Sequence, residues 1–124
     1  MNDKLDRLFI LRESFMKALC EKKPNEYPPW PIDIGDKTSQ QHVRDMALRG
    51  VEEMFEALQH LKNWKPHRDT QVDEFNHDEF IEEVVDAFNY FLSVLILMGI
   101  DSTALYEAYV KKDDIIHNRL KNGY

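Results

Sequence analysis

The chain has 124 residues, of which 43% are hydrophobic and 31% are charged, and its formal net charge is −7. This length and balance predict one globular domain over residues 1–124, and the scarcity of glycine and proline disfavours a β-rich fold. The negative charge argues against nucleic acid as a partner, because a phosphate backbone is bound by clustered Lys and Arg.

The sequence shows no signal for secretion or membrane insertion. Its first residues are charged and lack the basic-then-apolar order of a signal peptide. The longest apolar run, Val94 to Met98, is far shorter than a helix that crosses a bilayer. Cys20 is the single cysteine, so no internal disulfide can form. We therefore expect a cytoplasmic protein without a membrane partner.

Apolar residues at helical spacing predict two helices in the first half of the chain. The first covers about Asp3 to Cys20 and is followed by a segment, residues 23–31, whose four prolines exclude regular structure. The second begins at Thr38 or Ser39, because Thr38 and Gln41 have the spacing of a capping box. It is expected to stop near residues 64–66, before a polar loop that extends to residue 75.

Two more helices are predicted in the second half. Asn76 and Glu79 have a similar capping spacing and open a helix that runs to about Met98. Its second half, residues 91–98, is apolar nearly all round, which predicts burial. The fourth helix opens at Asp101 or Ser102 and runs to about residue 122. The predicted fold is therefore all-α, with the architecture of a four-helix bundle.

Acidic residues gather at two places, residues 52–56 on the second helix and residues 82–86 on the third. Residues three or four apart share a helix face, so Glu53 projects with Glu56, and Glu83 projects with Asp86. On the second helix these carboxylates face away from the centre of the apolar stripe, with Glu53 bordering Met46. A solvated acidic face would explain any single one of these residues.

Both clusters together favour a metal site. Like charges at this spacing destabilise a helix, and no basic residue interrupts either cluster. Two such helices packed side by side would assemble an oxygen-only ligand set that suits Mg²⁺, or alternatively Mn²⁺. A di-iron centre is disfavoured, because it needs Glu-x-x-His on two helices and only Glu74 and His77 have that spacing.

The pattern Glu-x-x-Glu followed by Glu-x-x-Asp resembles that of the all-α nucleoside triphosphate pyrophosphohydrolases, the superfamily of MazG and the dimeric dUTPases. The Trp64–Lys65 pair resembles the Trp-Lys that closes the same helix in dimeric dUTPases. The C-terminal run matches that family's last motif in register at four residues: Lys112, Arg119, Gly123 and Tyr124. The resemblance covers residues 40–124 and is closest to short phage enzymes that act on dUTP and dCTP.

The resemblance implies a Mg²⁺-dependent enzyme that converts a deoxynucleoside triphosphate to its monophosphate and pyrophosphate. The implied metal ligands are four carboxylates: Glu53, Glu56, Glu83 and Asp86. Glu52 or Glu82 would position or deprotonate the attacking water. Basic residues would neutralise the phosphates: Lys65, Lys112 and Arg119. Other expected substrate contacts are Asn89 at the sugar, Asn118 beside Arg119, and Tyr124 stacked on a base or sugar.

The chain departs from the family where the base is read. Dimeric dUTPases use a Gln and an Asn on the first helix, and Arg12 and Met16 stand near those places here. Asp113, Ile116 and Leu120 replace polar residues of the last motif. The substrate expectation is therefore dUTP or dCTP, with a MazG-like housecleaning enzyme for another or a non-standard nucleotide as the alternative.

The excess of apolar residues on the third helix predicts self-association. A lone four-helix bundle cannot cover all of them, so we expect a homodimer or homotetramer. In the resembled family the active site is completed at a subunit interface. A non-catalytic helical module that binds a basic protein through its acidic faces is the second alternative, and it predicts no hydrolysis.

Overall fold

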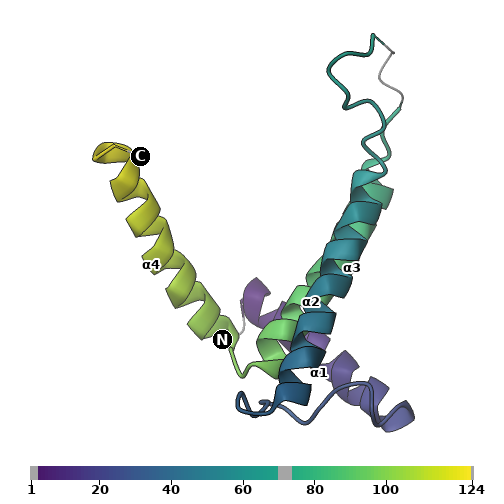
Figure 1. The fold of residues 1–124 in the computed structure, drawn as a ribbon, viewed down its shortest axis with the longest axis vertical. Helices are drawn as coiled ribbons and strands as arrows, with labels where there is room; N and C mark the ends of the chain where they lie inside the picture. Colours follow the sequence, from purple (N-terminus) through teal and green to yellow (C-terminus); the bar gives the residue numbers. More distant parts are fainter. Residues whose placement is uncertain (1–2, 70–73, 124) are drawn as a thin grey trace.

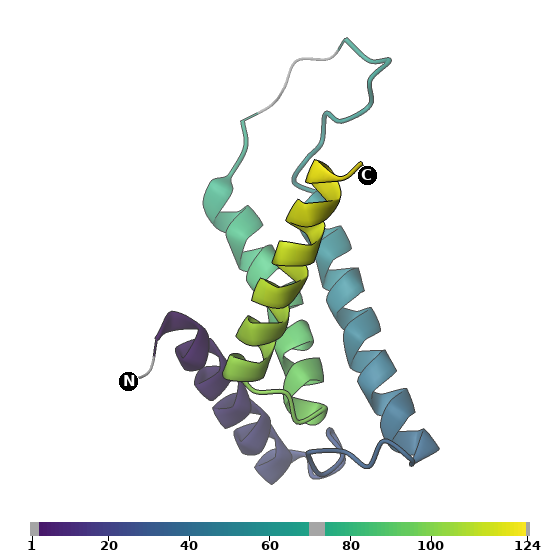
Figure 2. The ribbon, with the colours of Figure 1, turned by 90° about the vertical axis from the view of Figure 1, so that its left-hand side faces the viewer.

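The computed structural model describes residues 3–69 and 74–123, and within them the chain forms four helices and no strand. The helices are α1 (Lys4–Lys22), α2 (Lys37–Leu58), α3 (His77–Leu97) and α4 (Ser102–Lys121). Figures 1 and 2 show α2 and α3 as a long antiparallel pair, with α1 crossing near one end of that pair. The prediction of an all-α protein is confirmed.

The helix α4 stands apart from the α2–α3 pair, so the described chain has the outline of a V (Figure 1). The axes of α3 and α4 differ by 104° across the short break between them. Of the other helices, α4 contacts α1 alone, and the hydroxyl of Ser102 donates a hydrogen bond to the Asp6 carboxylate at that junction. One chain by itself therefore does not close into a bundle.

Among the described residues, no single helix is both long enough and apolar enough to cross a membrane. Only α3 and α4 taken together, as the bent pair, reach the required length and hydropathy.

Side-chain caps fix where the helices begin. Asp3 and Asp6 form a reciprocal capping box at α1, and Asn76 and Asp101 cap α3 and α4. The predicted beginnings of the third and fourth helices are thus confirmed. The predicted capping box at the second helix is wrong, because Asp36 is the cap and accepts from the backbone N–H and the hydroxyl of Ser39.

The end of α2 also differs from the prediction. The helix stops at Leu58, six residues before Trp64. The N–H of His60 donates to the carbonyl of Ala57, and that of Leu61 to Leu58, which are the tighter bonds that close a helix end. Residues 61–69 therefore form an irregular segment at the tip of the α2–α3 pair.

The core lies where α1, the proline-rich segment and the C-terminal half of α3 meet the beginning of α2. Its buried side chains are Phe9, Met16, Tyr27, Met46, Leu92, Ile96 and Leu97. The predicted burial of residues 91–98 holds in part, because Phe91 and Met98 remain 38% and 37% exposed. Exposed apolar side chains remain on the N-terminal half of α3 and along α4, which has no buried residue.

Candidate acidic metal site and adjoining groove

Small residues bring α2 and α3 together along one seam. Gly50 and Ala57 of α2 and Ala87 of α3 are buried, and Glu53 lies between the first two on the same helical face. The predicted apolar stripe of the second helix is therefore buried only in part: Met46 lies in the core, whereas Val51 and Leu58, which also belong to that stripe, are more than 40% exposed. As a result Glu53 is carried toward α3 and becomes half-buried.

Three carboxylates converge at this seam. Each of Glu53, Glu56 and Glu83 places one carboxylate oxygen within 4.8 Å of the other two. Glu53 and Glu83 are half-buried, whereas Glu56 is exposed. Asp86, one turn beyond Glu83, is close enough to act electrostatically on Glu53. The structure thus brings the acidic residues of both helices to one place.

The cluster is electrostatically strained. Burial raises the pKa of Glu53, and the nearby charge and hydrogen bond of Glu56 raise it further. Asp86 and Glu83 act in the same direction. None of the ion pairs among the described residues includes a carboxylate of the cluster.

The donor set fits a hard divalent cation. Carboxylate oxygens from two helices, without sulfur or imidazole among them, are the ligands that Mg²⁺ and Mn²⁺ prefer. Glu56 is exposed, so the site opens to solvent and leaves space for water and substrate oxygens. Glu52 and Glu82, the two predicted water-activating residues, are exposed on their helices next to Glu53 and Glu83.

A groove of about 700 Å³ adjoins the cluster, between α1, α2, α3 and the proline-rich segment. Glu53, Asp86 and Asn89 line its acidic part, so the structure places the predicted sugar-binding Asn89 beside two predicted metal ligands. Arg12 of α1 lines the groove, whereas Met16 is fully buried in the core. The groove is large enough for a nucleoside.

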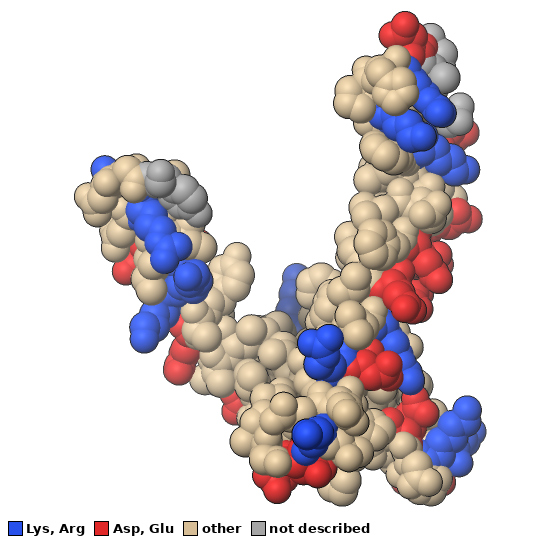
Figure 3. Space-filling view, in the orientation of Figure 1, with Lys and Arg blue, Asp and Glu red and all other residues tan. Residues whose placement is uncertain are grey.

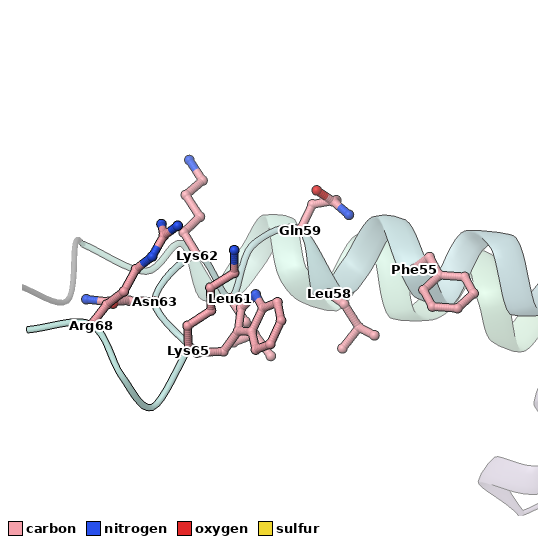
Figure 4. A pocket seen from close by; sticks show the side chains of 9 residues that line it. Phe55, Leu58, Gln59, Leu61, Lys62, Asn63, Lys65 and Arg68 are labelled. Atoms are coloured by element: carbon pink, nitrogen blue, oxygen red, sulfur yellow. The ribbon is translucent and has the colours of Figure 1, made fainter. Parts of the chain in front are cut away.

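A second hollow of about 680 Å³ lies at the end of α2 and carries positive charge. Lys62, Lys65 and Arg68 line it (Figure 4). Trp64 also lines it and is 69% exposed. The Lys65 ammonium lies 5.7 Å from the centroid of the Trp64 ring. In Figure 3 basic side chains gather near the tip of the α2–α3 pair, just below an acidic group at its end, and more acidic side chains lie further along the pair. The predicted phosphate-binding Lys65 therefore has basic neighbours.

The remaining predicted contacts are not brought to the site within one chain. Lys112, Asn118 and Arg119 are exposed on α4, which contacts neither α2 nor α3. Figure 1 shows this helix directed away from the α2–α3 pair. Tyr124 lies outside the described residues.

Several groove residues were not predicted from the sequence. Tyr27, Tyr90 and Glu26 line the groove, and Arg49 does so while it pairs with Glu26 at 3.2 Å. They come from three separate segments, so no local spacing links them. Only Tyr27, an aromatic residue in a proline-rich segment, could have been singled out from the sequence. The chain matches no protein-family model, no curated protein and no solved structure.

Proposed function

We propose that the protein is a Mg²⁺-dependent deoxynucleoside triphosphate pyrophosphohydrolase that acts on dUTP, dCTP or both. The observation that carries this proposal is the convergence of Glu53, Glu56 and Glu83 without a basic partner among the described residues. The adjoining groove and the basic hollow supply space for a nucleoside and positive charge for phosphates. The motifs that resemble those of MazG and the dimeric dUTPases support the same assignment.

In this proposal Glu53, Glu56, Glu83 and Asp86 would hold the cation, which would supply positive charge for the phosphate oxygens and an activated water. Glu52 or Glu82 accepts a proton from the attacking water. Water adds to phosphorus, the phosphoanhydride bond breaks, and monophosphate and pyrophosphate are released. Lys65 binds phosphate oxygens from the tip of the α2–α3 pair, and Asn89 contacts the sugar.

The proposed assembly is a homodimer or homotetramer in which α4 of one copy lies against another copy. Tyr106 and Tyr109 of α4 are 63% and 70% exposed, and Ile81 and Phe88 of α3 are 58% and 57% exposed. Burying these faces against a second copy removes apolar surface from water. Such packing would also carry Lys112 and Arg119 toward a partner's substrate, which a single chain does not do.

The test incubates the protein with each deoxynucleoside triphosphate, with and without Mg²⁺, and measures monophosphate and pyrophosphate. We expect Mg²⁺-dependent turnover of dUTP or dCTP. Glu56→Gln and Glu83→Gln should each lower kcat at least about 100-fold, as loss of charge-stabilising groups does in other sites. Glu21→Gln, at an exposed acid near the end of α1, is the matched control and should retain full activity.

The exposed acidic side chains of α2 and α3 also favour one alternative, a non-catalytic helical module that binds a basic protein through its acidic faces. It predicts no pyrophosphate from any nucleotide and no effect of Mg²⁺ on the melting temperature. A folded protein with that behaviour would replace the enzymatic proposal by the binding module. Turnover of a modified triphosphate alone would instead indicate a MazG-like housecleaning enzyme.

A further inference from the structure

Arg12 is a half-buried arginine without an acidic partner among the described residues. Its Nε donates a hydrogen bond to the hydroxyl of Ser93, 2.8 Å away. Its guanidinium carbon lies 4.8 Å from the centroid of the Phe15 ring and 5.8 Å from that of Tyr90. A partly buried charge usually needs a partner of opposite charge or several hydrogen bonds. Arg12 is therefore held in place through Nε, and its two terminal nitrogens make no hydrogen bond or ion pair with the described residues.

Arg12 lines the groove at the distance from the acidic residues where the base of a bound nucleotide would lie. Asp86, Asn89 and Ser93 follow one another at helical spacing on α3, so they share one side of the helix. Seven residues of helix separate Asp86 from Ser93, a distance of about 10 Å. This is close to the length of a deoxynucleoside. A nucleotide with its phosphates near Asp86 therefore brings its base to the guanidinium that Ser93 holds.

The chemistry of the free end of Arg12 is selective. With Nε engaged by Ser93, the two terminal nitrogens present parallel donors and no acceptor. Cytosine offers two adjacent acceptors, O2 and N3, to such a pair. Uracil and thymine carry an N3–H donor between their two carbonyls, so a donor would face a donor. The arginine therefore matches cytosine and mismatches the other pyrimidines.

A second groove residue agrees with cytosine. Glu26 lines the same groove and is held by Arg49 at 3.2 Å. Its carboxylate is an acceptor for the exocyclic amino group of cytosine, a group that uracil and thymine lack. Guanine also presents two adjacent acceptors, O6 and N7, but that edge has no amino group for Glu26.

We propose that Arg12, positioned by Ser93, determines the base specificity of the groove and selects cytosine over uracil and thymine. This inference rests on the proposed triphosphate hydrolysis, and the test separates the two. The preference for cytosine follows from the donor pattern of Arg12, whereas the resembled enzymes read uracil with Gln and Asn.

The test compares kcat/KM for dCTP, dUTP and dGTP in the wild type and in Arg12→Gln, whose amide offers one donor and one acceptor. We expect the wild type to prefer dCTP, and the dCTP-to-dUTP ratio to fall about 10- to 100-fold in the variant, the discrimination of one bidentate contact. Arg7→Gln, at an exposed arginine of α1 outside the groove, should leave the ratio unchanged. Ser93→Ala keeps the charge but frees the guanidinium, and should lower the ratio through the KM for dCTP.

Metal-free binding of dCMP and dUMP, measured by calorimetry, gives a readout independent of hydrolysis. Tighter binding of dCMP than of dUMP, lost in folded Arg12→Gln, supports the inference even if no triphosphate is hydrolysed. Absence of hydrolysis together with this binding preference would overturn only the proposed function. Hydrolysis with an unchanged dCTP-to-dUTP ratio in Arg12→Gln overturns the inference and leaves the function standing. A wild type that prefers dUTP or dGTP also overturns the inference. A protein that neither hydrolyses triphosphates nor discriminates dCMP from dUMP overturns both the inference and the proposed function.

Discussion

Gly50 of α2 lies directly against the aromatic ring of Phe91 on α3. A Cβ atom at Gly50 would be 2.8 Å from Cε1 of that ring, closer than carbon atoms pack. The two helices approach here because one of them has no side chain. Glu53 follows Gly50 by one turn on the same face, so the close approach also sets the distance between the acidic residues of α2 and those of α3.

Replacing Gly50 by Val should lower stability and disturb the acidic cluster. Overpacking of a helix contact costs about 1–3 kcal/mol, and the ring of Phe91 must move. Gly50→Ala should cost less, because alanine favours helix by about 1 kcal/mol relative to glycine. Denaturant unfolding measures the stability, and the rise in melting temperature on adding Mg²⁺ measures the cluster.

Phe91→Ala provides the control for this contact. In a double-mutant cycle, Gly50→Val should be better tolerated when Phe91 is already alanine, because the space of the ring is then free. Equal costs of Gly50→Val in both backgrounds would show that the ring is not what excludes a side chain at this position.

The raised pKa of Glu53 predicts how stability responds to pH. The folded protein binds this proton more tightly than the unfolded chain does, so without metal its stability falls as pH rises through the interval between the unfolded and the folded pKa. Mg²⁺ competes with the same proton. Its stabilising effect should therefore grow as pH rises through that interval, which melting curves recorded at several pH values will show.

Glu56→Gln should change the stability of the metal-free protein and its response to Mg²⁺ in opposite directions. Of the neighbouring charges, Glu56 raises the pKa of Glu53 most, so its removal should stabilise the metal-free protein by about 0.2–0.5 kcal/mol at neutral pH. The same variant should lose the Mg²⁺ response. Glu21→Gln should change neither quantity. A metal-free protein that is destabilised by Glu56→Gln would contradict the repulsive arrangement.

The fold was predictable from sequence where the signal is local. Asn76 and Asp101 cap helices through hydrogen bonds to residues three positions away, so spacing alone located α3 and α4. The beginning of α2 was misplaced because Asp36 provides the cap in place of Thr38. Its end was misplaced because apolar residues continue to Trp64 after the helical hydrogen bonds have stopped.

The candidate site was likewise predictable only where its residues are close together in the sequence. Glu53 and Glu56 are neighbours by helical period, so their pairing follows from the sequence. That Glu53 lies on the contact face of α2 depends on Gly50 and Ala57, small residues that a hydrophobic stripe does not reveal. The placement of Arg12 depends on Ser93, which is 81 residues away along the chain, and no periodic pattern links them.

Removing a positive charge from the hollow at the end of α2 should weaken triphosphate binding. Lys65→Ala and Arg68→Ala each delete one side chain that lines it, and each should raise the Kd of a non-hydrolysable triphosphate roughly 10-fold, as loss of a charge-assisted hydrogen bond does. Binding of the monophosphate should change little. Lys22→Ala, at an exposed lysine that ends α1, controls for overall charge, and an equal effect there would point to non-specific attraction.

A charge on the apolar face of α4 should dissociate the assembly. Tyr109 is 70% exposed in the single chain and would be covered by a second copy, so Tyr109→Glu should shift the mass measured by light scattering to that of a monomer. Lys111→Glu lies about 200° around the same helix and should leave the assembly intact. A monomeric wild type with full hydrolytic activity would contradict the proposed assembly.

Mixing two inactive variants tests whether a site is shared between copies. Glu56→Gln removes a proposed metal ligand on α2, and Arg119→Ala removes a proposed phosphate contact on α4, two helices that do not meet within one chain. If α4 acts on the partner's cluster, random re-pairing in a dimer restores one intact site in each mixed dimer, about a quarter of all sites. Pyrophosphate release near that level after mixing, with neither variant active alone, is the expected result. Without recovery, although subunits have exchanged, Arg119 has no role at a partner's substrate.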